Sequence, residues 1–210
     1  MIEKGLLVVI SGPSGSGKGT IVNLLTESKS NFKASVSATT RNKREGEKEG
    51  ISYNFITKNE FNKMIENDKL IEWVEYCGHY YGTPQKCVDE AIENGEDILL
   101  EVEVVGAKNI KEKYPDSILV FVLPPSYAEL RRRLKKRGTE GNKSIEKRME
   151  RAKQEFKQID LYDYLVINDK IDEATNHIKN IVEIEKLRVK RNNSTIIKWE
   201  ESFKKLNVER

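Results

Sequence analysis

Short apolar runs alternate along the chain with stretches in which apolar residues recur every three or four positions. The first run, residues 5–10, stops at Ser11, Gly12 and Pro13, which is typical of a buried strand that ends in a loop. Three more short aliphatic runs follow, at residues 98–102, 117–123 and 164–167. Strands that alternate with amphipathic helices predict an α/β fold, in which helices cover both faces of a central parallel sheet.

The helical stretches carry their own boundary signals. One helix is expected from about Lys18, and another from Ser126 to about Arg137, because Ser126 and Glu129 have the spacing of a capping box. Two later helices are expected from apolar positions at helical spacing, and Asp172 could cap the second of them. The candidate core residues of these helices are Ile21, Val22, Leu24 and Leu25, then Ile145, Met149, Ala152 and Phe156, and finally Ala174, Ile178, Ile181 and Val182.

A glycine-rich loop follows the first predicted strand and precedes the first predicted helix. Its residues are Gly12, Pro13, Ser14, Gly15, Ser16, Gly17 and Lys18, which have the GxxxxGK spacing of a phosphate loop. Glycines let the backbone wrap a phosphate, the amides and the helix dipole supply donors, and the lysine adds positive charge. The alternative, a glycine-rich turn with an exposed lysine, is disfavoured because the strand and the helix are both in place.

The residue after Lys18 departs from the usual phosphate loop. Gly19 stands where a Ser or Thr normally binds Mg²⁺, and Thr20 comes one residue late. We therefore expect Mg²⁺ to be held by nucleotide phosphates and water molecules, and carboxylates to bind those water molecules. This arrangement suits an ion that keeps much of its hydration.

The polar segment between the first helix and residue 89 interrupts the alternation of strands and helices, and we interpret it as an inserted lobe. It contains one short helix, which a second capping box opens at Thr57 and Glu60. A glycine-bearing polar stretch at residues 138–143 is suited to a flap. The expected organisation is a core with the phosphate loop (1–36), the inserted lobe (37–89), a core with a flap at about 138–147 (90–191) and a C-terminal amphipathic tail (192–210).

Arg41 and Arg44 lie three residues apart in the inserted segment and could converge on one phosphate. On composition alone a solvated charged loop would be favoured, since Lys43, Glu45 and Glu47 lie beside them.

A series of short motifs changes that balance, because their order and spacing resemble the guanylate kinase family over about residues 5–190. The matching pieces are residues 12–18, 37–44, 46–47, 53–55, 71–73, 78–83, 101–103, 106, 124–126, 133–138, 147–148 and 168–169. The resemblance implies a P-loop kinase with a small inserted lobe that binds the nucleoside monophosphate. It also implies that ATP and Mg²⁺ are used to phosphorylate GMP, and dGMP as well, by direct in-line transfer in purine nucleotide metabolism.

The resemblance assigns the acceptor site residue by residue. Arg41, Arg44, Tyr53 and Tyr81 would hold the GMP phosphate, and Ser37, Glu72, Thr83 and Glu103 would bind the guanine ring. Glu72 is the decisive residue physically, because its carboxylate can accept from both N1–H and the 2-amino group of guanine, whereas adenine offers an acceptor at N1. In a regular strand Glu72 would lie on the face opposite Ile71 and Trp73, and its alternative role is that of a surface acid.

The resemblance also assigns the donor side. The ATP site would comprise residues 12–20, Arg133, Arg137 and Asn168, and the expected catalytic residues are Lys18, Arg41, Arg137 and Arg148. Glu101 is expected to orient water bound to Mg²⁺. Glu101 and Glu103 stand where many family members have aspartates, so their longer side chains leave the reach of both carboxylates open.

Composition excludes several other classes of protein. The net charge is +3, from 37 basic and 34 acidic residues, which is too even to indicate nucleic acid or membrane as the main partner. Cys77 and Cys87 form no CxxC pair, and no secretory signal is visible, so a cytoplasmic protein with reduced thiols is expected.

The tail beyond residue 191 falls outside the resemblance. A break at residues 192–195 precedes a predicted helix with an apolar face formed by Ile196, Trp199, Phe203 and Leu206. This face is expected to dock on its own domain, with self-association as the alternative.

Two rival functions stay open at this point. The run from Gly17 to Thr20 also resembles adenylate kinases, which would make the acceptor AMP. A guanylate-kinase-like interaction module without catalysis is the other rival, although such modules typically lack an intact phosphate loop.

Overall fold

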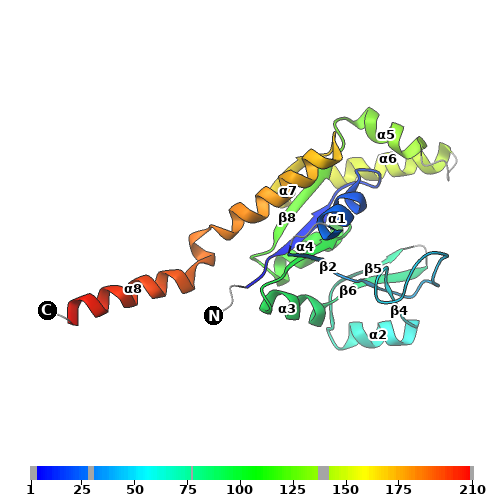
Figure 1. Cartoon of the computed structure of the whole chain (residues 1–210). Helices are drawn as coiled ribbons and strands as arrows, with labels where there is room; N and C mark the ends of the chain where they lie inside the picture. The colour runs from blue at the N-terminus through cyan, green and yellow to red at the C-terminus, as the bar shows by residue number, and fades with distance from the viewer. Residues whose placement is uncertain (1–3, 28–30, 77, 137–141, 209–210) are drawn as a thin grey trace.

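Two sheets organise the chain, as the computed structural model in Figure 1 shows; it describes residues 4–27, 31–76, 78–136 and 142–208. The larger sheet is parallel and has the strand order β2-β7-β1-β8-β9. Its strands are β1 (Leu7–Ser11), β2 (Phe32–Ala34), β7 (Asp97–Glu101), β8 (Ile118–Leu123) and β9 (Tyr164–Ile167). The predicted α/β fold with a central parallel sheet is confirmed.

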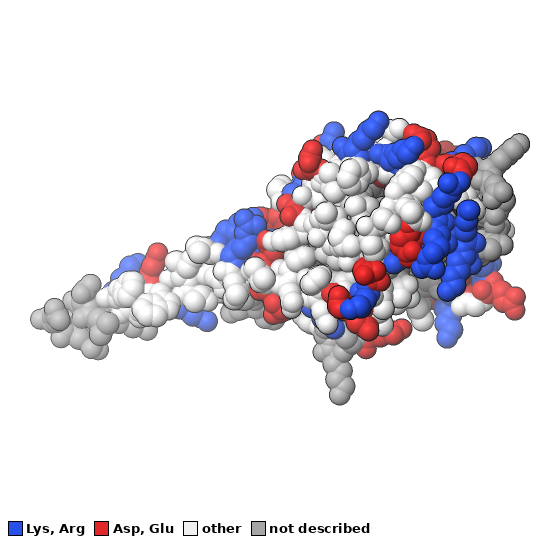
Figure 2. All heavy atoms as spheres, turned by 90° about the horizontal axis from the view of Figure 1, so that it is seen from above, with Lys and Arg blue, Asp and Glu red and all other residues white. Residues whose placement is uncertain are grey.

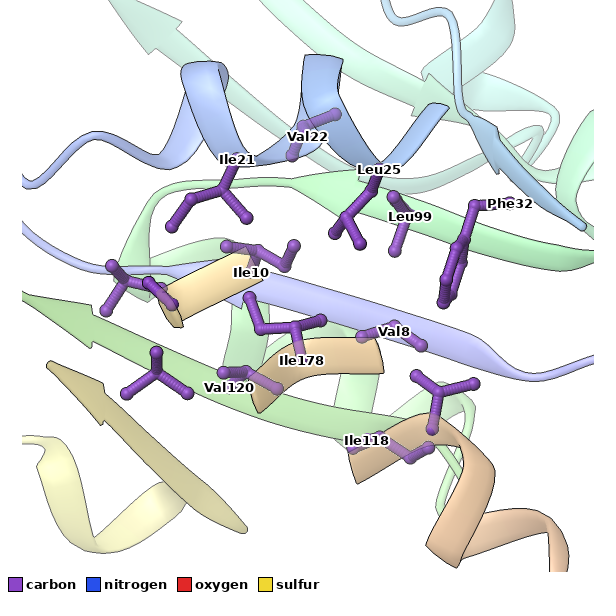
Figure 3. Close-up of a cluster of buried hydrophobic side chains, with 14 of the residues drawn as sticks. Val8, Ile10, Ile21, Val22, Leu25, Phe32, Leu99, Ile118, Val120 and Ile178 are labelled. Atoms are coloured by element: carbon purple, nitrogen blue, oxygen red, sulfur yellow. The ribbon is translucent and has the colours of Figure 1, made fainter. Parts of the chain in front are cut away.

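Helices cover both faces of this sheet because its central strands are apolar on both sides. On one face Val8 and Ile10 pack with residues of α1 (Lys18–Glu27) and α7 (Ile171–Lys186), and Figure 3 shows this cluster around Ile21, Leu25 and Ile178. The other face packs against α3 (Gln85–Glu93) and α4 (Val104–Lys113), through the alternate strand residues. The sheet is therefore held rigidly in the middle of the molecule.

The second sheet is small and lies in the segment between α1 and α3. Its strand order is β4-β3-β6-β5, formed by β3 (Ala38–Thr39), β4 (Asn54–Phe55), β5 (Leu70–Tyr76) and β6 (His79–Pro84). One helix, α2 (Lys58–Glu66), packs Phe61 under it. The predicted capping box is confirmed, since Glu60 N donates to Thr57 Oγ1 and Thr57 N donates to Glu60 Oε2.

Two other predicted helix starts differ from the structure. At α5 (Tyr127–Lys136) only half of the capping box forms, because Ser126 Oγ accepts from Glu129 N while the Glu129 carboxylate binds Arg132 and Arg133. Asp172 does not cap α7; it lies inside the first turn, and the cap position is Lys170, without a side-chain hydrogen bond.

The predicted flap overlaps a helix. The helix α6 spans Asn142–Phe156, so the second part of the expected flap at 138–147 is helical, and residues 138–141 lie outside the described residues. Ile145, Met149 and Ala152 are buried against α5 as expected, whereas Phe156 is 51% exposed.

The last helix, α8 (Asn193–Val208), extends away from the sheets as the red arm of Figure 1. It follows the 3₁₀ turn Val189–Arg191, which is tied to the body by hydrogen bonds from Arg191 to Glu185 and to the carbonyl of Asp116. The other 3₁₀ turn, Ile159–Leu161, lies between α6 and β9. Trp199 is 63% exposed and Phe203 53% exposed, and Figure 2 shows mainly uncharged atoms on the side of the arm that faces the viewer. The expected docking of this face on its own domain was wrong. Among the described residues no helix has the length and apolar character needed to cross a membrane.

Removal of the arm tests whether α8 supports the fold. We expect truncation after Asn192 to change the melting temperature by less than about 2 °C, because the described side chains of α8 are almost all solvent-exposed. Scanning calorimetry of the full and truncated chains would measure the change. A fall of 5 °C or so would contradict it, since burial of even one large aromatic side chain contributes about 1.5–3 kcal/mol.

Candidate active site

One cavity of about 610 Å³ lies between the carboxyl ends of β1 and β7 and the small sheet. It is lined by residues predicted for both substrates: Ser14, Gly15, Gly17, Lys18, Gly19, Ser37, Arg41, Arg44, Tyr53, Glu72, Tyr81, Thr83, Glu101 and Glu103. The predicted residues outside this lining are Gly12, Pro13, Ser16, Thr20, Arg133, Arg148 and Asn168. Arg137 lies outside the described residues.

The phosphate loop has a backbone that favours glycine at three points, Gly12, Gly15 and Gly17. Gly12 has φ 141° and Gly17 has φ 95°, both in the left-handed half of conformational space. A Cβ at Gly12 would overlap the carbonyl oxygen of Val122, and one at Gly17 would overlap the side-chain nitrogen Nδ2 of Asn168. Lys18 Nζ lies over the loop and donates to the carbonyl of Gly12 at 2.6 Å.

Three residues predicted for the donor side brace the loop from outside the cavity lining. Asn168 is 3% exposed and its Nδ2 donates to the carbonyl of Ser16 at 2.7 Å. The carbonyl of Asn168 in turn accepts from Arg133 at 2.9 Å. Arg148 reaches in from α6 and donates to Ser14 Oγ at 2.7 Å. The loop is thereby linked to β9, α5 and α6 at once.

Glu101 and Gly19 lie next to each other. β1 and β7 are paired in parallel with Ile10 opposite Glu101, so this carboxylate comes out of the sheet beside the start of α1. A Cβ on Gly19 would lie 3.3 Å from Glu101 Oε2, which is a crowded contact. The carboxylate therefore occupies space that a Ser or Thr at position 19 would partly fill, and it could hold water ligands of Mg²⁺ there.

The Arg41 side chain is fixed by Glu47, an acid that was not among the predicted site residues. Its two terminal nitrogens donate to Glu47 at 2.7 and 3.0 Å, and its guanidinium lies 5.5 Å from the ring centre of Tyr53. Glu47 also accepts from the backbone nitrogen of Arg44 at 2.8 Å. The hydrogen bonds from Arg41 and Arg44 lower the pKa of Glu47 to about 2. The Arg41 guanidinium is thus held beside Tyr53, whose ring centre is 6.0 Å from that of Tyr81, whereas only the backbone of Arg44 is fixed by Glu47.

Glu72 is a nearly buried carboxylate, 9% exposed, that faces the cavity. Its Oε1 accepts from Thr83 Oγ1 at 2.7 Å, and burial raises its pKa. The strand around Glu72 is irregular, whereas a regular strand was expected. The pairing of β5 with β6 shifts register between Leu70 and Trp73, and the neighbours Ile71 and Glu72 are both buried. Gly106 leaves the space for this carboxylate, since a Cβ there would lie 3.0 Å from Glu72 Oε2.

Arg151 also lines the cavity, although it was not among the predicted site residues. Its NH2 nitrogen donates to Glu103 Oε2 at 3.0 Å. The one signal in the sequence was its place three residues after Arg148, on the same face of a predicted helix.

Known proteins are similar to this chain over most of its length. Residues 4–185 match the family model described as guanylate kinase. The guanylate kinase of Desulfitobacterium hafniense (strain Y51) is 49% identical over 187 residues, which cover 89% of this chain and 94% of that protein. The guanylate kinase of Lactococcus lactis subsp. lactis is 49% identical over 191 residues, 91% of this chain and 93% of that one. The crystal structure of guanylate kinase from Anaplasma phagocytophilum has a TM-score of 0.73 at 33% identity and covers 90% of each chain. The chain belongs to the guanylate kinase family.

Proposed function

We propose that this chain transfers the γ-phosphoryl group of ATP to GMP, giving GDP and ADP, and that dGMP is a second acceptor. The single observation that carries the proposal is the shared cavity. It joins a phosphate loop that contains Lys18 to a pre-oriented Arg41 and a buried Glu72. A phosphate loop alone would indicate only that a nucleotide binds.

The donor side of the proposal rests on positive charge around the loop. Loop amides and Lys18 would hold the ATP phosphates. Arg148, which donates to Ser14 Oγ of the loop, would also bind these phosphates. Arg133 and Asn168 would act by bracing the loop, and Arg137 would add a further guanidinium beside the phosphates.

On the acceptor side, Arg41, Arg44, Tyr53 and Tyr81 would hold the GMP phosphate. The two arginines would bind it as charge-assisted donors, and the tyrosine hydroxyls would add neutral donors. Ser37, Glu72, Thr83 and Glu103 would bind the guanine ring. Because Thr83 already donates to one oxygen of Glu72, that carboxylate is held with its remaining lone pairs toward the cavity.

Transfer requires little covalent help from the protein. The acceptor oxygen is already largely ionised near neutral pH, so no general base is needed, and positioning and positive charge carry the catalysis. Mg²⁺, bound with ATP, would supply charge to the β- and γ-phosphates. Glu101 would orient water in its shell, while Lys18 stays on the phosphates and Arg41 fixes the acceptor in line.

The proposal includes a cytoplasmic enzyme whose partners are these small molecules, with no nucleic acid or membrane partner. Self-association through the exposed apolar face of α8 stays a prediction. Light scattering of the chain truncated after Asn192 would test it, because loss of the face should leave only monomer.

A coupled assay of ADP production is the direct test of the activity. With ATP and Mg²⁺ constant, GMP and dGMP should be turned over, and AMP, CMP and UMP almost not at all. A preference for AMP would overturn the base assignment while leaving ATP binding intact. A folded protein that turns over no acceptor would instead indicate a binding module.

The Glu72→Gln variant tests guanine recognition. A glutamine amide would present a donor to the donors of guanine, so kcat/KM for GMP should fall about 10²-fold or more while the KM for ATP changes little. The matched control is Glu75→Gln, which removes an exposed acid of the same strand outside the cavity lining and should leave kinetics unchanged.

The pH dependence of GMP binding follows from the same carboxylate. Burial raises the pKa of Glu72 above its ordinary value of about 4.3, so protonation begins at a higher pH than for an exposed glutamate. GMP affinity should therefore weaken on acidification, beginning at a higher pH than that at which an exposed glutamate is protonated.

A raised folded-state pKa of Glu72 contributes stability that is lost as pH rises, so Glu72→Gln should be at least as stable as the wild type at pH 7. Denaturant unfolding would show this, and a marked loss of stability would mean that the variant reports on folding instead of recognition.

A further inference from the structure

The helix α6 contacts both halves of the cavity through one face. Arg148 donates to Ser14 of the phosphate loop at 2.7 Å, and Arg151 donates to Glu103 Oε2 at 3.0 Å. Residues three apart on a helix share a face. One rigid element therefore joins the loop proposed for ATP to the acid proposed for guanine.

Arg151 is held in place by a buried acid on its own helix. Its Nε donates to Glu155 Oε1 at 2.8 Å, and the Glu155 side chain is only 10% exposed. Burial raises the pKa of Glu155, and the hydrogen bond from Arg151 opposes that rise. The guanidinium is thus anchored at Nε and presents NH2 to the cavity side.

Glu103 depends on this guanidinium for its orientation. It occupies the N-cap position of α4, but its side chain makes no capping hydrogen bond there. Its side chain is half-exposed, so in the absence of a partner it would sample several rotamers in water. The ion pair with Arg151 restricts it to one direction along the cavity wall.

We propose that Arg151 is a positioning residue that fixes Glu103 for guanine binding and so couples the acceptor site to the placement of α6 on the phosphate loop. This inference rests on the proposed function. ATP that holds Arg148 and α6 against the loop favours the Arg151–Glu103 pair, and GMP bound to Glu103 favours the same position of α6. Each substrate must then tighten the binding of the other by the same factor.

The coupling should be modest in size. Both partners are about half-exposed, with side-chain exposures of 47% and 50%, and pairs of that kind are weakened by water. We expect the ion pair to change GMP affinity by about 3- to 10-fold, and the effect should be larger with the ATP site filled.

The test measures binding of GMP by calorimetry, with and without a non-hydrolysable ATP analogue, in the wild type and in Arg151→Gln. Arg151→Gln alone leaves the buried Glu155 carboxylate without its partner Arg151. The double variant Arg151→Gln, Glu155→Gln is therefore measured as well. In both variants the analogue should no longer tighten GMP binding, while affinity for the analogue alone is unchanged. The control is Lys153→Gln, which removes one charge from an exposed ion pair of the same helix.

A double-mutant cycle with Glu103→Gln separates positioning from direct contact. If Arg151 acts through Glu103, its replacement should cause no further loss in the Glu103→Gln background. Additive losses, or weaker binding of the ATP analogue alone, would overturn the proposal and assign Arg151 to the phosphates. If the wild type turns over GMP and Arg151→Gln binds it with unchanged affinity and coupling, the inference fails while the proposed function stands. Absence of GMP turnover by the wild type would remove the function itself.

Discussion

The parallel pairing of β1 between β7 and β8 is the constraint on which the rest of the structure depends. Parallel strands end on the same edge, so the phosphate loop after Ser11 and the carboxylate of Glu101 emerge side by side. Both faces of β1 are buried under helices, which leaves this edge as the place where polar groups can gather without loss of core. The small sheet then closes the cavity from the other side.

Inside the cavity, charged groups are oriented by partners before any substrate arrives. Glu47 holds Arg41, Thr83 holds Glu72, and Arg151 holds Glu103, each through at least one hydrogen bond of 3.0 Å or less. A pre-oriented group loses less conformational entropy on binding than a free one. The cost is an acid such as Glu72 taken out of water, which a single hydroxyl donor offsets only in part, as its raised pKa indicates.

How far the sequence predicted this arrangement depends on the range of the interactions involved. The four strands predicted for the large sheet, the phosphate loop and the Thr57 capping box are local patterns, and these were found where expected, whereas the short strand β2 was not predicted. Ser126 showed the same local pattern, but Glu129 had arginines within reach and bound them instead. Arg151 and Glu103 are 48 residues apart in the chain, so only the folded structure brings them together. The docking of α8 on its own domain was wrongly predicted for a related reason. Amphipathic spacing indicates that a helix has an apolar face, but it does not indicate which surface covers that face.

Gly19 and Glu101 both depart from common motifs, and the two departures compensate for each other in space. Gly19 removes the hydroxyl that usually follows the loop lysine, and Glu101 carries one methylene more than the aspartate common at its position. Glu101 Oε2 reaches to within 3.3 Å of where a Cβ at position 19 would lie. A longer acid from the sheet therefore extends into the space beside the loop that a missing side chain leaves open. Taken singly, each departure casts doubt on how Mg²⁺ is held. Taken together, they place a carboxylate oxygen of the neighbouring strand beside the start of α1, where we propose that it holds water bound to Mg²⁺.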